Sequence, residues 1–320
     1  MRAAYLDCFS GISGNMFLGA LVDAGLPEQV LRDAIAKIDL KGFSIKIKPV
    51  DKWGIRATHL DVDLTAKHHH RGLADILKLI RAAELPDAVK DKACLVFERL
   101  GKAEAKVHGM PLDKVHFHEV GAVDAIIDIV GTVFGFHYLG VEQIYCSPLR
   151  VGRGFVKAAH GIMPIPAPAT AELLHGIPWY PGDIDKELVT PTGAALVAEL
   201  CSGFGDRPTG FLAEKTAYGA GTWDLVIPNV MRLSLGSLPE QKNSDEMWLL
   251  EANVDDSTPE VIAYAIDKLL AAGAVDAWIT PIIMKKGRPA FLLSALCMET
   301  NKIAVEDVVF AETSSIGVRW

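Results

Sequence analysis

The sequence lacks a long hydrophobic run, since no stretch reaches the ~18 apolar residues that a membrane-spanning helix needs. Asp7 also interrupts the only N-terminal segment that could pass for a signal peptide. An excess of basic residues is absent too, because 32 Lys and Arg stand against 40 Asp and Glu. The resulting net charge of -8 opposes binding to nucleic acid backbones or anionic lipids. These absences predict a soluble, cytoplasmic protein with no nucleic-acid and no membrane partner.

Cysteine is scarce, and its spacing excludes several kinds of site. The five cysteines form no CxxC pair: Cys8, Cys94, Cys146, Cys201 and Cys297. Neither a structural zinc site, a redox couple nor a disulfide framework is therefore expected. We interpret the cysteines as small buried core residues, which free cysteine often is. Only Cys8 suggests more, because it stands beside a glycine-rich loop.

The length and the hydrophobic content allow two cores. Half of the 320 residues are hydrophobic, and domains usually span ~100–200 residues. The segment 236–246, GSLPEQKNSDE, is polar, contains Pro239 and separates two regions of clear hydrophobic patterning. Such a segment is typical of a linker. We therefore predict a larger domain over residues 1–240 and a small domain over residues 246–320.

Hydrophobic periodicity predicts an α+β protein. In the small domain it predicts strands at 248–254, 277–284, 290–297 and 316–320, with helices up to Gly273 and at 303–312. Ser257 and Glu260 have the spacing of a capping box at the start of the first helix. The order β-α-β-β-α-β is that of the ferredoxin-like fold. The larger domain mixes helices with short strands, and its topology does not follow from the pattern.

The segment HFHEVGAVDAIIDIVG carries the densest set of metal-ligand types. Five side chains in it are candidate ligands: His116, His118, Glu119, Asp124 and Asp128. The two histidines project to one side if the chain is extended, and the two aspartates share one face of an apolar helix. Carboxylates on such a face are costly to bury unless a cation or a hydrogen-bond donor neutralises them. The segment predicts a transition-metal site; the alternative is carboxylates that bond neighbouring backbone and histidines that pack in the core.

A second histidine group lies in a loop between an expected strand and an expected helix. Consecutive residues cannot all face one ion, so His68 and His70 are counted as candidate ligands and a solvated loop is the alternative. Imidazoles and carboxylates together suit nickel, zinc, cobalt or manganese, and ligand type alone does not choose among them.

Two loops rich in glycine or threonine precede expected helices. They are DCFSGISGNM at 7–16 and VTPTGAAL from Val189, and the glycines of YGAGTWD from Tyr218 are comparable. Backbone N–H groups at a positive helix end can bind phosphate or carboxylate. The spacing matches neither a Walker A loop nor a dinucleotide fingerprint, and a tight strand-to-helix turn is the alternative. The candidate binding residues are Ser10, Gly11, Ser13, Gly14, Thr190, Thr192 and Gly193.

The small domain holds a third group of polar residues. Acidic residues end its first strand, a basic turn follows its second, and hydroxyl residues come before Arg319. Carboxylate ligands near basic side chains can hold a metal-bound triphosphate, although each turn taken singly is ordinary. The candidates are Asp255, Asp256, Lys285, Lys286, Arg288 and Thr313.

Together and in this order, these segments resemble the nickel-insertion family that matures the nickel-pincer cofactor of lactate racemase, the pyridinium-3,5-bisthiocarboxylic acid mononucleotide nickel chelatases. The resemblance covers nearly the whole chain through GISGNMFLGALVDAG, HFHEVGAVDAIIDIVG, HGIMPIPAPATAELL, TPTGAAL, YGAGTWD, EANVDD, MKKGRP and ETSSIGVR. It implies an enzyme, a nickel chelatase or cyclometallase of the lyase class. Such an enzyme inserts Ni2+ into a pyridinium mononucleotide bearing two thiocarboxylates and consumes CTP with Mn2+ or Mg2+. It also implies lactate racemase apoprotein as a partner and a homo-oligomer.

Under this resemblance, the domain 1–240 binds metal and substrate and the domain 246–320 is associated with the nucleotide. The hypothesis is that the histidines and carboxylates of 116–128 hold nickel while the two loops seat the substrate phosphate. Either His118 or Asp124 then accepts the ring proton as the metal replaces it. The competing hypotheses are a nickel metallochaperone without turnover and a zinc-type hydrolase of a phosphorylated metabolite.

Two positions depart from the family pattern. Asn15 stands where the family usually has aspartate, which weakens any charge-based role for that position. The chain also ends at Trp320, whereas relatives continue beyond the ETSSIGVR-like segment. We expect the chain to lack that C-terminal extension, which leaves CTP binding and turnover open.

Overall fold

The computed structural model describes residues 1–65, 71–115, 117, 123–158, 161–239 and 246–320. The chain divides into two compact units, Met1–Pro239 and Glu240–Trp320. This division falls inside the polar segment 236–246.

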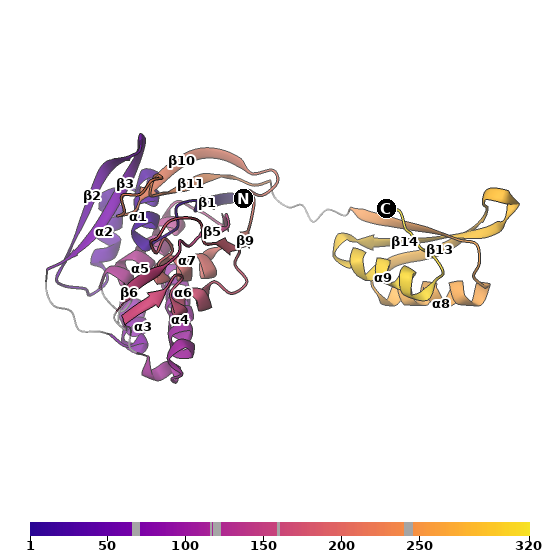
Figure 1. The fold of residues 1–320 in the computed structure, drawn as a ribbon, viewed down its shortest axis with the longest axis horizontal. Helices are drawn as coiled ribbons and strands as arrows, with labels where there is room; N and C mark the ends of the chain where they lie inside the picture. The colour runs from indigo at the N-terminus through magenta and orange to yellow at the C-terminus, as the bar shows by residue number, and fades with distance from the viewer. Residues whose placement is uncertain (66–70, 116, 118–122, 159–160, 240–245) are drawn as a thin grey trace. The chain divides into compact units, whose positions relative to one another are not determined.

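A seven-stranded mixed sheet forms the centre of unit 1 (Figure 1), with the order β2-β3-β10-β11-β1-β4-β9. Its strands are β1 (Arg2–Asp7), β2 (Phe43–Lys52), β3 (Ile55–Leu64), β4 (Gln143–Cys146), β9 (Gly203–Phe204), β10 (Leu212–Ala220) and β11 (Val230–Ser237). β1 pairs antiparallel with β11 and parallel with β4. Two small pairs are separate from this sheet: β5 (Leu149–Arg150) with β8 (Trp179–Tyr180), and β6 (Phe155–Ala158) with β7 (Gly161–Pro164).

The helices of unit 1 cover this sheet and bury the main core. They are α1 (Gly14–Asp23), α2 (Glu28–Ala36), α3 (Leu73–Ala82), α4 (Asp87–His108), η1 (Leu112–Lys114), α5 (Val123–Tyr138), α6 (Pro168–Leu173) and α7 (Pro191–Leu200). α1 packs on β3 and β10, and α5 packs on α1. The close packing of α1 on β10 needs glycine, because a Cβ on Gly219 would lie 1.8 Å from the carbonyl oxygen of Met16.

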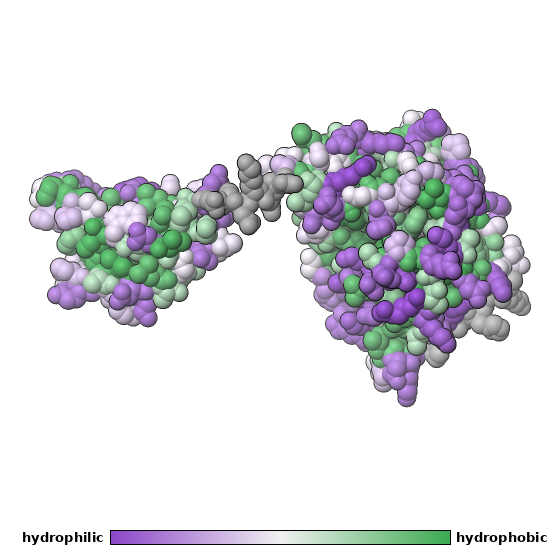
Figure 2. All heavy atoms as spheres, turned by 180° about the vertical axis from the view of Figure 1, so that it is seen from behind, coloured by the Kyte–Doolittle hydropathy of each residue, from purple (hydrophilic) through white to green (hydrophobic). Residues whose placement is uncertain are grey.

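Unit 2 is a three-stranded antiparallel sheet with two helices. Its elements are β12 (Met247–Val254), α8 (Pro259–Ala271), β13 (Ala274–Ile283), η2 (Lys285–Gly287), β14 (Pro289–Met298), η3 (Glu299–Asn301) and α9 (Lys302–Glu312). β14 lies between β12 and β13. Its core is separate from that of unit 1 and includes Leu250, Ile262, Leu293 and Val305. Figure 2 shows a hydrophobic area on one face of this unit.

Two local predictions for unit 2 are wrong. The expected strand at 316–320 is reduced to one bridge between Arg319 and Glu251, because Ser315 Oγ bonds the carbonyl of Gly317 and turns the chain. The expected capping residue Ser257 is not the N-cap of α8. Thr258 takes that place with Pro259 following it, while the Ser257 hydroxyl lies 3.0 Å from the Ser314 hydroxyl.

The chain is a mixed α+β protein, as the periodicity predicted. In the part of the chain that the structure describes, no helix is both long and apolar enough to cross a bilayer.

Candidate metal and substrate site

The two loops predicted to bind an anion lie side by side. The backbone N–H of Ile12 donates to the carbonyl of Leu188 at 2.8 Å, and that of Thr190 donates to the carbonyl of Ile12 at 3.1 Å. A Cβ on Gly193 would lie 2.5 Å from the carbonyl oxygen of Ile12, so this approach requires glycine there. The starts of α1 and α7 are therefore joined, although they are far apart in the sequence.

A cavity of about 310 Å³ lies beside these helix starts. It brings together six residues that the sequence singled out: Ser13, Gly14, Thr190, Thr192, Asp124 and Asp128. The first four come from the starts of α1 and α7, and the two aspartates come from the first turns of α5. Helix starts carry partial positive charge and N–H groups without intrahelical partners. The cavity thus places amide donors and carboxylates around one space.

Each of the two aspartates of α5 has one carboxyl oxygen that the described residues leave without a partner. In each of Asp124 and Asp128, the Oδ1 atom is buried and has no hydrogen-bond partner among the described residues. Burial raises the pKa of the Asp128 carboxyl well above its ordinary value, and the charges of Asp124 and Asp61 raise it further. Buried, unpaired carboxyl oxygens are expected where a cation binds rather than where side chains cap local backbone.

The sequence reasoning missed two further carboxylates in this cavity, Asp61 and Glu187. Asp61 is on β3. An acidic residue on a strand in which polar and apolar residues alternate is usually an ordinary exposed residue, so the sequence did not single it out. Glu187 precedes the TPTG segment, so its nearness to that loop was the only available signal. With these two, four carboxylates line one cavity, which favours a cation and opposes a phosphate placed directly against them.

Not all of the predicted loop residues reach the cavity lining. Ser10 is buried and faces Asn229, whose Nδ2 lies 3.4 Å from both Ser10 Oγ and the Ser10 carbonyl. Gly11, with φ of +83°, packs on the backbone of Leu188. Their role is to turn the chain tightly, which is the alternative that the sequence left open for this loop. Asn15 does line the cavity, and its Oδ1 accepts a hydrogen bond from Ser13 Oγ.

The predicted histidine ligands lie outside the described residues, and so does the acidic residue that follows them: His68, His70, His116, His118 and Glu119. Among the residues that are described, no three His, Cys, Asp or Glu side chains are arranged to hold a metal ion. The described part of the site is therefore an acidic cavity with an aspartate pair rather than a full ligand set.

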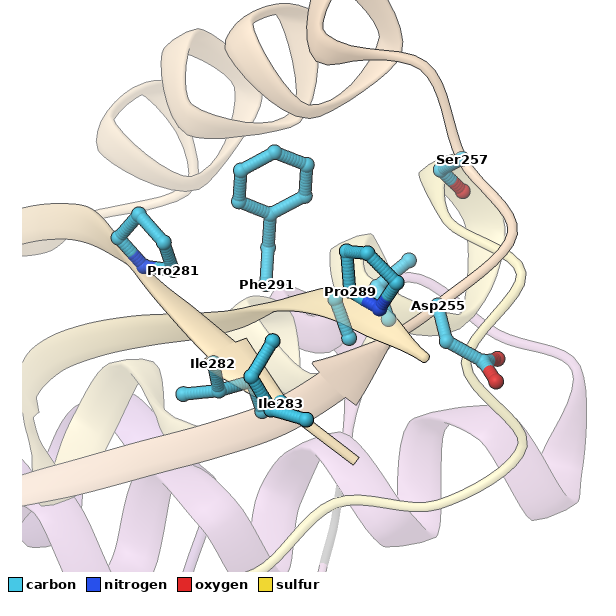
Figure 3. A pocket seen from close by; sticks show the side chains of 9 residues that line it. Asp255, Ser257, Pro281, Ile282, Ile283, Pro289 and Phe291 are labelled. Atoms are coloured by element: carbon cyan, nitrogen blue, oxygen red, sulfur yellow. The ribbon is translucent and has the colours of Figure 1, made fainter. Parts of the chain in front are cut away.

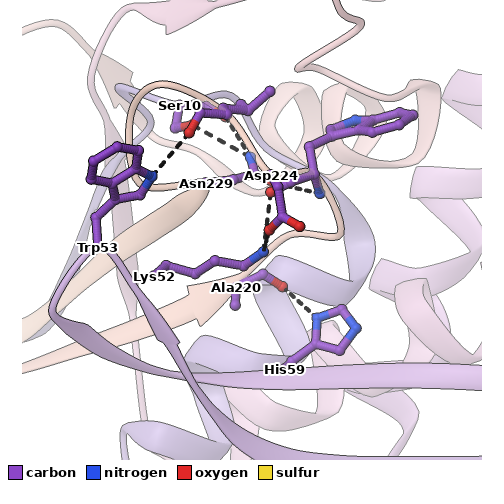
Figure 4. A network of polar contacts seen from close by, with 9 residues as sticks. Ser10, Lys52, Trp53, His59, Ala220, Asp224 and Asn229 are labelled. Atoms are coloured by element: carbon purple, nitrogen blue, oxygen red, sulfur yellow. Dashed lines mark hydrogen bonds and ion pairs between the residues drawn. The ribbon is translucent and has the colours of Figure 1, made fainter.

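The segment YGAGTWD contributes Thr222 to the cavity and is fixed by polar contacts (Figure 4). Lys52, the last residue of β2, donates from Nζ to Asp224 Oδ1 at 2.8 Å and to the carbonyl of Trp223 at 3.1 Å. Trp53 Nε1 donates to the carbonyl of Leu225 at 2.9 Å. The β2–β3 turn therefore supports the loop that closes one side of the cavity.

A second cavity, of about 280 Å³, adjoins the first, since both are lined by Glu187 and Pro191. Lys157 of β6, Met163 of β7 and His108 of α4 line its other sides. The site therefore extends from the aspartate pair toward a cavity whose walls hold apolar, basic and acidic side chains, Glu104 among the last.

Unit 2 has a pocket of about 320 Å³ near its own predicted site (Figure 3). Asp255 and Ser257 line it together with an apolar wall that includes Pro281, Ile282 and Phe291. Arg288 lies 3.3 Å from a carboxyl oxygen of Asp255.

The other predicted residues of unit 2 have local partners or lie beside the pocket. Asp256 accepts a hydrogen bond from the Ser314 hydroxyl. The Thr313 hydroxyl donates to the carbonyl of Val309 at 2.6 Å and thereby bonds the last turn of α9. Lys285 and Lys286 belong to η2 and do not line the pocket, and Lys286 has a φ of 63°.

A family model described as nickel insertion protein matches residues 4–320. The chain belongs to the nickel insertion protein family. Family membership confirms the resemblance inferred from the motifs.

Curated members of the nickel insertion protein family match over the full chain. The chain is 50% identical over 325 residues to the pyridinium-3,5-bisthiocarboxylic acid mononucleotide nickel insertion protein of Desulfitobacterium hafniense (strain DSM 10664 / DCB-2), covering 100% of this chain and 81% of that protein. It is 49% identical to the putative nickel insertion protein of Thermomicrobium roseum, covering 100% of this chain and 79% of that protein.

A solved structure matches over a shorter region. It is the apo form of the C-terminal domain of a cyclometallase involved in the synthesis of the NPN cofactor of lactate racemase. That match has 44% identity and a TM-score of 0.23, and it covers 23% of this chain and 51% of that chain.

Proposed function

We propose that this chain inserts nickel into pyridinium-3,5-bisthiocarboxylic acid mononucleotide, the compound in the name of the D. hafniense relative, to give the nickel-pincer cofactor of lactate racemase. The observation that carries the proposal is the pair Asp124 and Asp128, each with a buried Oδ1 that lacks a partner among the described residues. Ni2+, which is a substrate of this reaction, supplies the positive charge that these oxygens lack. His68, His70, His116, His118 and Glu119 are proposed to complete its ligand set.

The charges of the cavity suggest an order of binding. Four carboxylates repel a phosphate or a thiocarboxylate, so nickel should bind before the anionic parts of the mononucleotide. Once the metal has neutralised the aspartates, the N–H groups at the start of α1 and the N–H of Thr192 in α7 can attract an anion. The N–H groups of Thr190 and Gly193 already donate, to the carbonyl of Ile12 and to the Thr190 hydroxyl. Thr190, Thr192 and the amides around Ser13 and Gly14 are then proposed to hold the substrate phosphate.

The chemical step needs a base, because the ring carbon exchanges a proton for nickel. Either Asp124 or His118 is proposed as the base that accepts this proton while the carbon–nickel bond forms. The cationic pyridinium ring is itself favoured by the acidic cavity.

We also propose that unit 2 binds CTP with Mn2+ or Mg2+. Asp255 and Asp256 carry oxygen ligands for such a hard cation, and Lys285, Lys286 and Arg288 carry charges that suit a triphosphate. The apolar wall with Phe291 can receive a pyrimidine base. We further propose that unit 2 is a ferredoxin-like domain whose fourth strand is reduced to the bridge at Arg319.

The proposal is tested by nickel titration of the purified full chain. The double variant Asp124→Asn with Asp128→Asn should lose stoichiometric nickel binding, whereas Asp39→Asn, a solvated acid outside the cavity, should bind like the wild type. Undiminished affinity in the double variant would place the nickel site elsewhere. Cofactor formation, followed by absorbance with and without CTP, separates an enzyme from a metallochaperone that binds nickel without turnover.

A further inference from the structure

Three of the five cysteines meet at one place in unit 1. Cys8 follows β1, Cys146 ends β4, and Cys201 follows the C-terminus of α7. β1 and β4 are parallel neighbours with Leu6 opposite Cys146, so the chain leaves both strands at the same edge of the sheet. The Sγ atoms of Cys8 and Cys146 are 3.6 Å apart, and the Cys201 thiol hydrogen-bonds that of Cys146. The absence of a CxxC motif hid this cluster from the sequence analysis.

The three cysteine residues differ in exposure, and their thiols differ in acidity. Cys8 and Cys146 are fully buried, whereas Cys201 is partly exposed. Hydrogen bonds from Cys201 and Cys8 lower the pKa of the Cys146 thiol, while burial raises the pKa of the other two. Cys201 is therefore the residue of the cluster that a disulfide from solution meets first, and Cys146 lies between it and Cys8.

We propose that Cys8 and Cys146 form a reversible disulfide, and that Cys201 is the thiol through which a low-molecular-weight disulfide first reacts. The pairing rests on the short distance between the two sulfur atoms, and the role of Cys201 rests on its exposure beside them. The cross-link would fix the start of the glycine-rich loop 7–16, because the carbonyl of Cys8 accepts a hydrogen bond from the N–H of Gly11 at 3.0 Å.

Each step is a thiol–disulfide exchange. The Cys201 thiolate attacks a disulfide RSSR, forms a mixed disulfide with one R group and releases one RSH after protonation. The Cys146 thiolate then attacks the Cys201 sulfur and releases the second RSH. Finally Cys8 attacks the Cys146 sulfur, and Cys201 returns to a thiol. In sum, two protein thiols are oxidised and one RSSR is reduced to two RSH.

The test uses the reduced full chain incubated with mixtures of oxidised and reduced glutathione. The reaction is quenched by acid and alkylation, and the peptides are mapped by mass spectrometry. We expect the loss of two of the five free thiols and a peptide pair that joins Cys8 to Cys146, both reversed by dithiothreitol. Cys94 of α4 and Cys297 of β14 are internal controls that should stay alkylated.

Variants separate the role of Cys201 from that of the pair. Both Cys201→Ala and Cys201→Ser should form the same cross-link more slowly than the wild type, while Cys94→Ala should form it at the wild-type rate. Equal rates in all of these proteins would overturn the role of Cys201. The proposal as a whole is overturned if Cys8 and Cys146 stay reduced while Cys94 or Cys297 is glutathionylated. A cross-link between Cys146 and Cys201 that persists at equilibrium overturns the assigned pair.

Discussion

Replacing Asp128 by asparagine should stabilise the metal-free protein while weakening nickel binding. The wild-type side chain buries a carboxyl oxygen without a partner among the described residues, and an amide of the same shape removes the charge. Leaving a buried charged group unsatisfied costs more than the ~1–3 kcal/mol of a neutral polar group, and the asparagine keeps only the smaller cost. For a unit of this size, each kcal/mol shifts the melting temperature by about 2–4 °C. We therefore expect Asp128→Asn to melt several degrees above the wild type at neutral pH.

The pH dependence of this gain follows from the direction of the pKa shift. The folded-state pKa of Asp128 is raised above its ordinary value of 3.8. Between these two values the folded state holds a proton that the unfolded state has lost, so wild-type stability falls as pH rises. Asparagine does not titrate, so the variant does not lose stability in this way as pH rises. Its advantage should be absent below the ordinary pKa, grow through this window and level off above the raised pKa.

Thermal unfolding in the presence of a chelator, followed by circular dichroism at a series of pH values, measures this difference. Asp39→Asn is the control, since Asp39 is a solvated acid outside the cavity. It should change the melting temperature little at any pH. If Asp128→Asn is no more stable than the wild type at neutral pH, the carboxyl is already neutralised and the argument for a bare anion fails.

Three further predictions follow from the same contacts. Nickel affinity should rise with pH across the raised pKa of Asp128, because the proton competes with the metal. Calorimetry should show this pH dependence in the wild type and a smaller one in Asp128→Asn. Gly14→Ala should cost about 1–3 kcal/mol of stability and weaken nickel binding, because the added Cβ would lie 2.2 Å from Asp128 Oδ2. Unfolding and nickel titration measure both effects. Gly317→Ala is the control, because a Cβ at Gly317 would lie within 4 Å of no described atom. Arg288→Ala should weaken CTP binding and leave nickel affinity unchanged; a CTP titration in which Arg288→Ala binds like the wild type would contradict the nucleotide site.

The sequence was informative where periodicity and composition act locally. The aspartate pair was found because a carboxylate on an apolar helix face is costly, and the loops were found because glycine and threonine precede helices. Asp61 and Glu187 could not be found in this way, because their nearness depends on how β3 and the segment before α7 meet. Ser10 was misjudged for the converse reason: a serine in a glycine loop looks available, yet the loop turns it toward Asn229.

The cysteines show that separation in the sequence also hides neighbours in the fold. Their separation in the sequence argued against any shared chemistry, and only the parallel pairing of β1 with β4 brings two of them together. Topology, rather than local pattern, decided which of these side chains became neighbours.

The backbone bonds that join Ile12 to Leu188 and Thr190 make the starts of α1 and α7 one rigid wall. Neither helix can shift outward alone without breaking them. A ligand too large for the cavity must therefore gain its space from the other walls, where Asp61 and Thr222 stand on a hairpin and a loop. Substrate size should accordingly be tolerated on that side and discriminated against on the helix side.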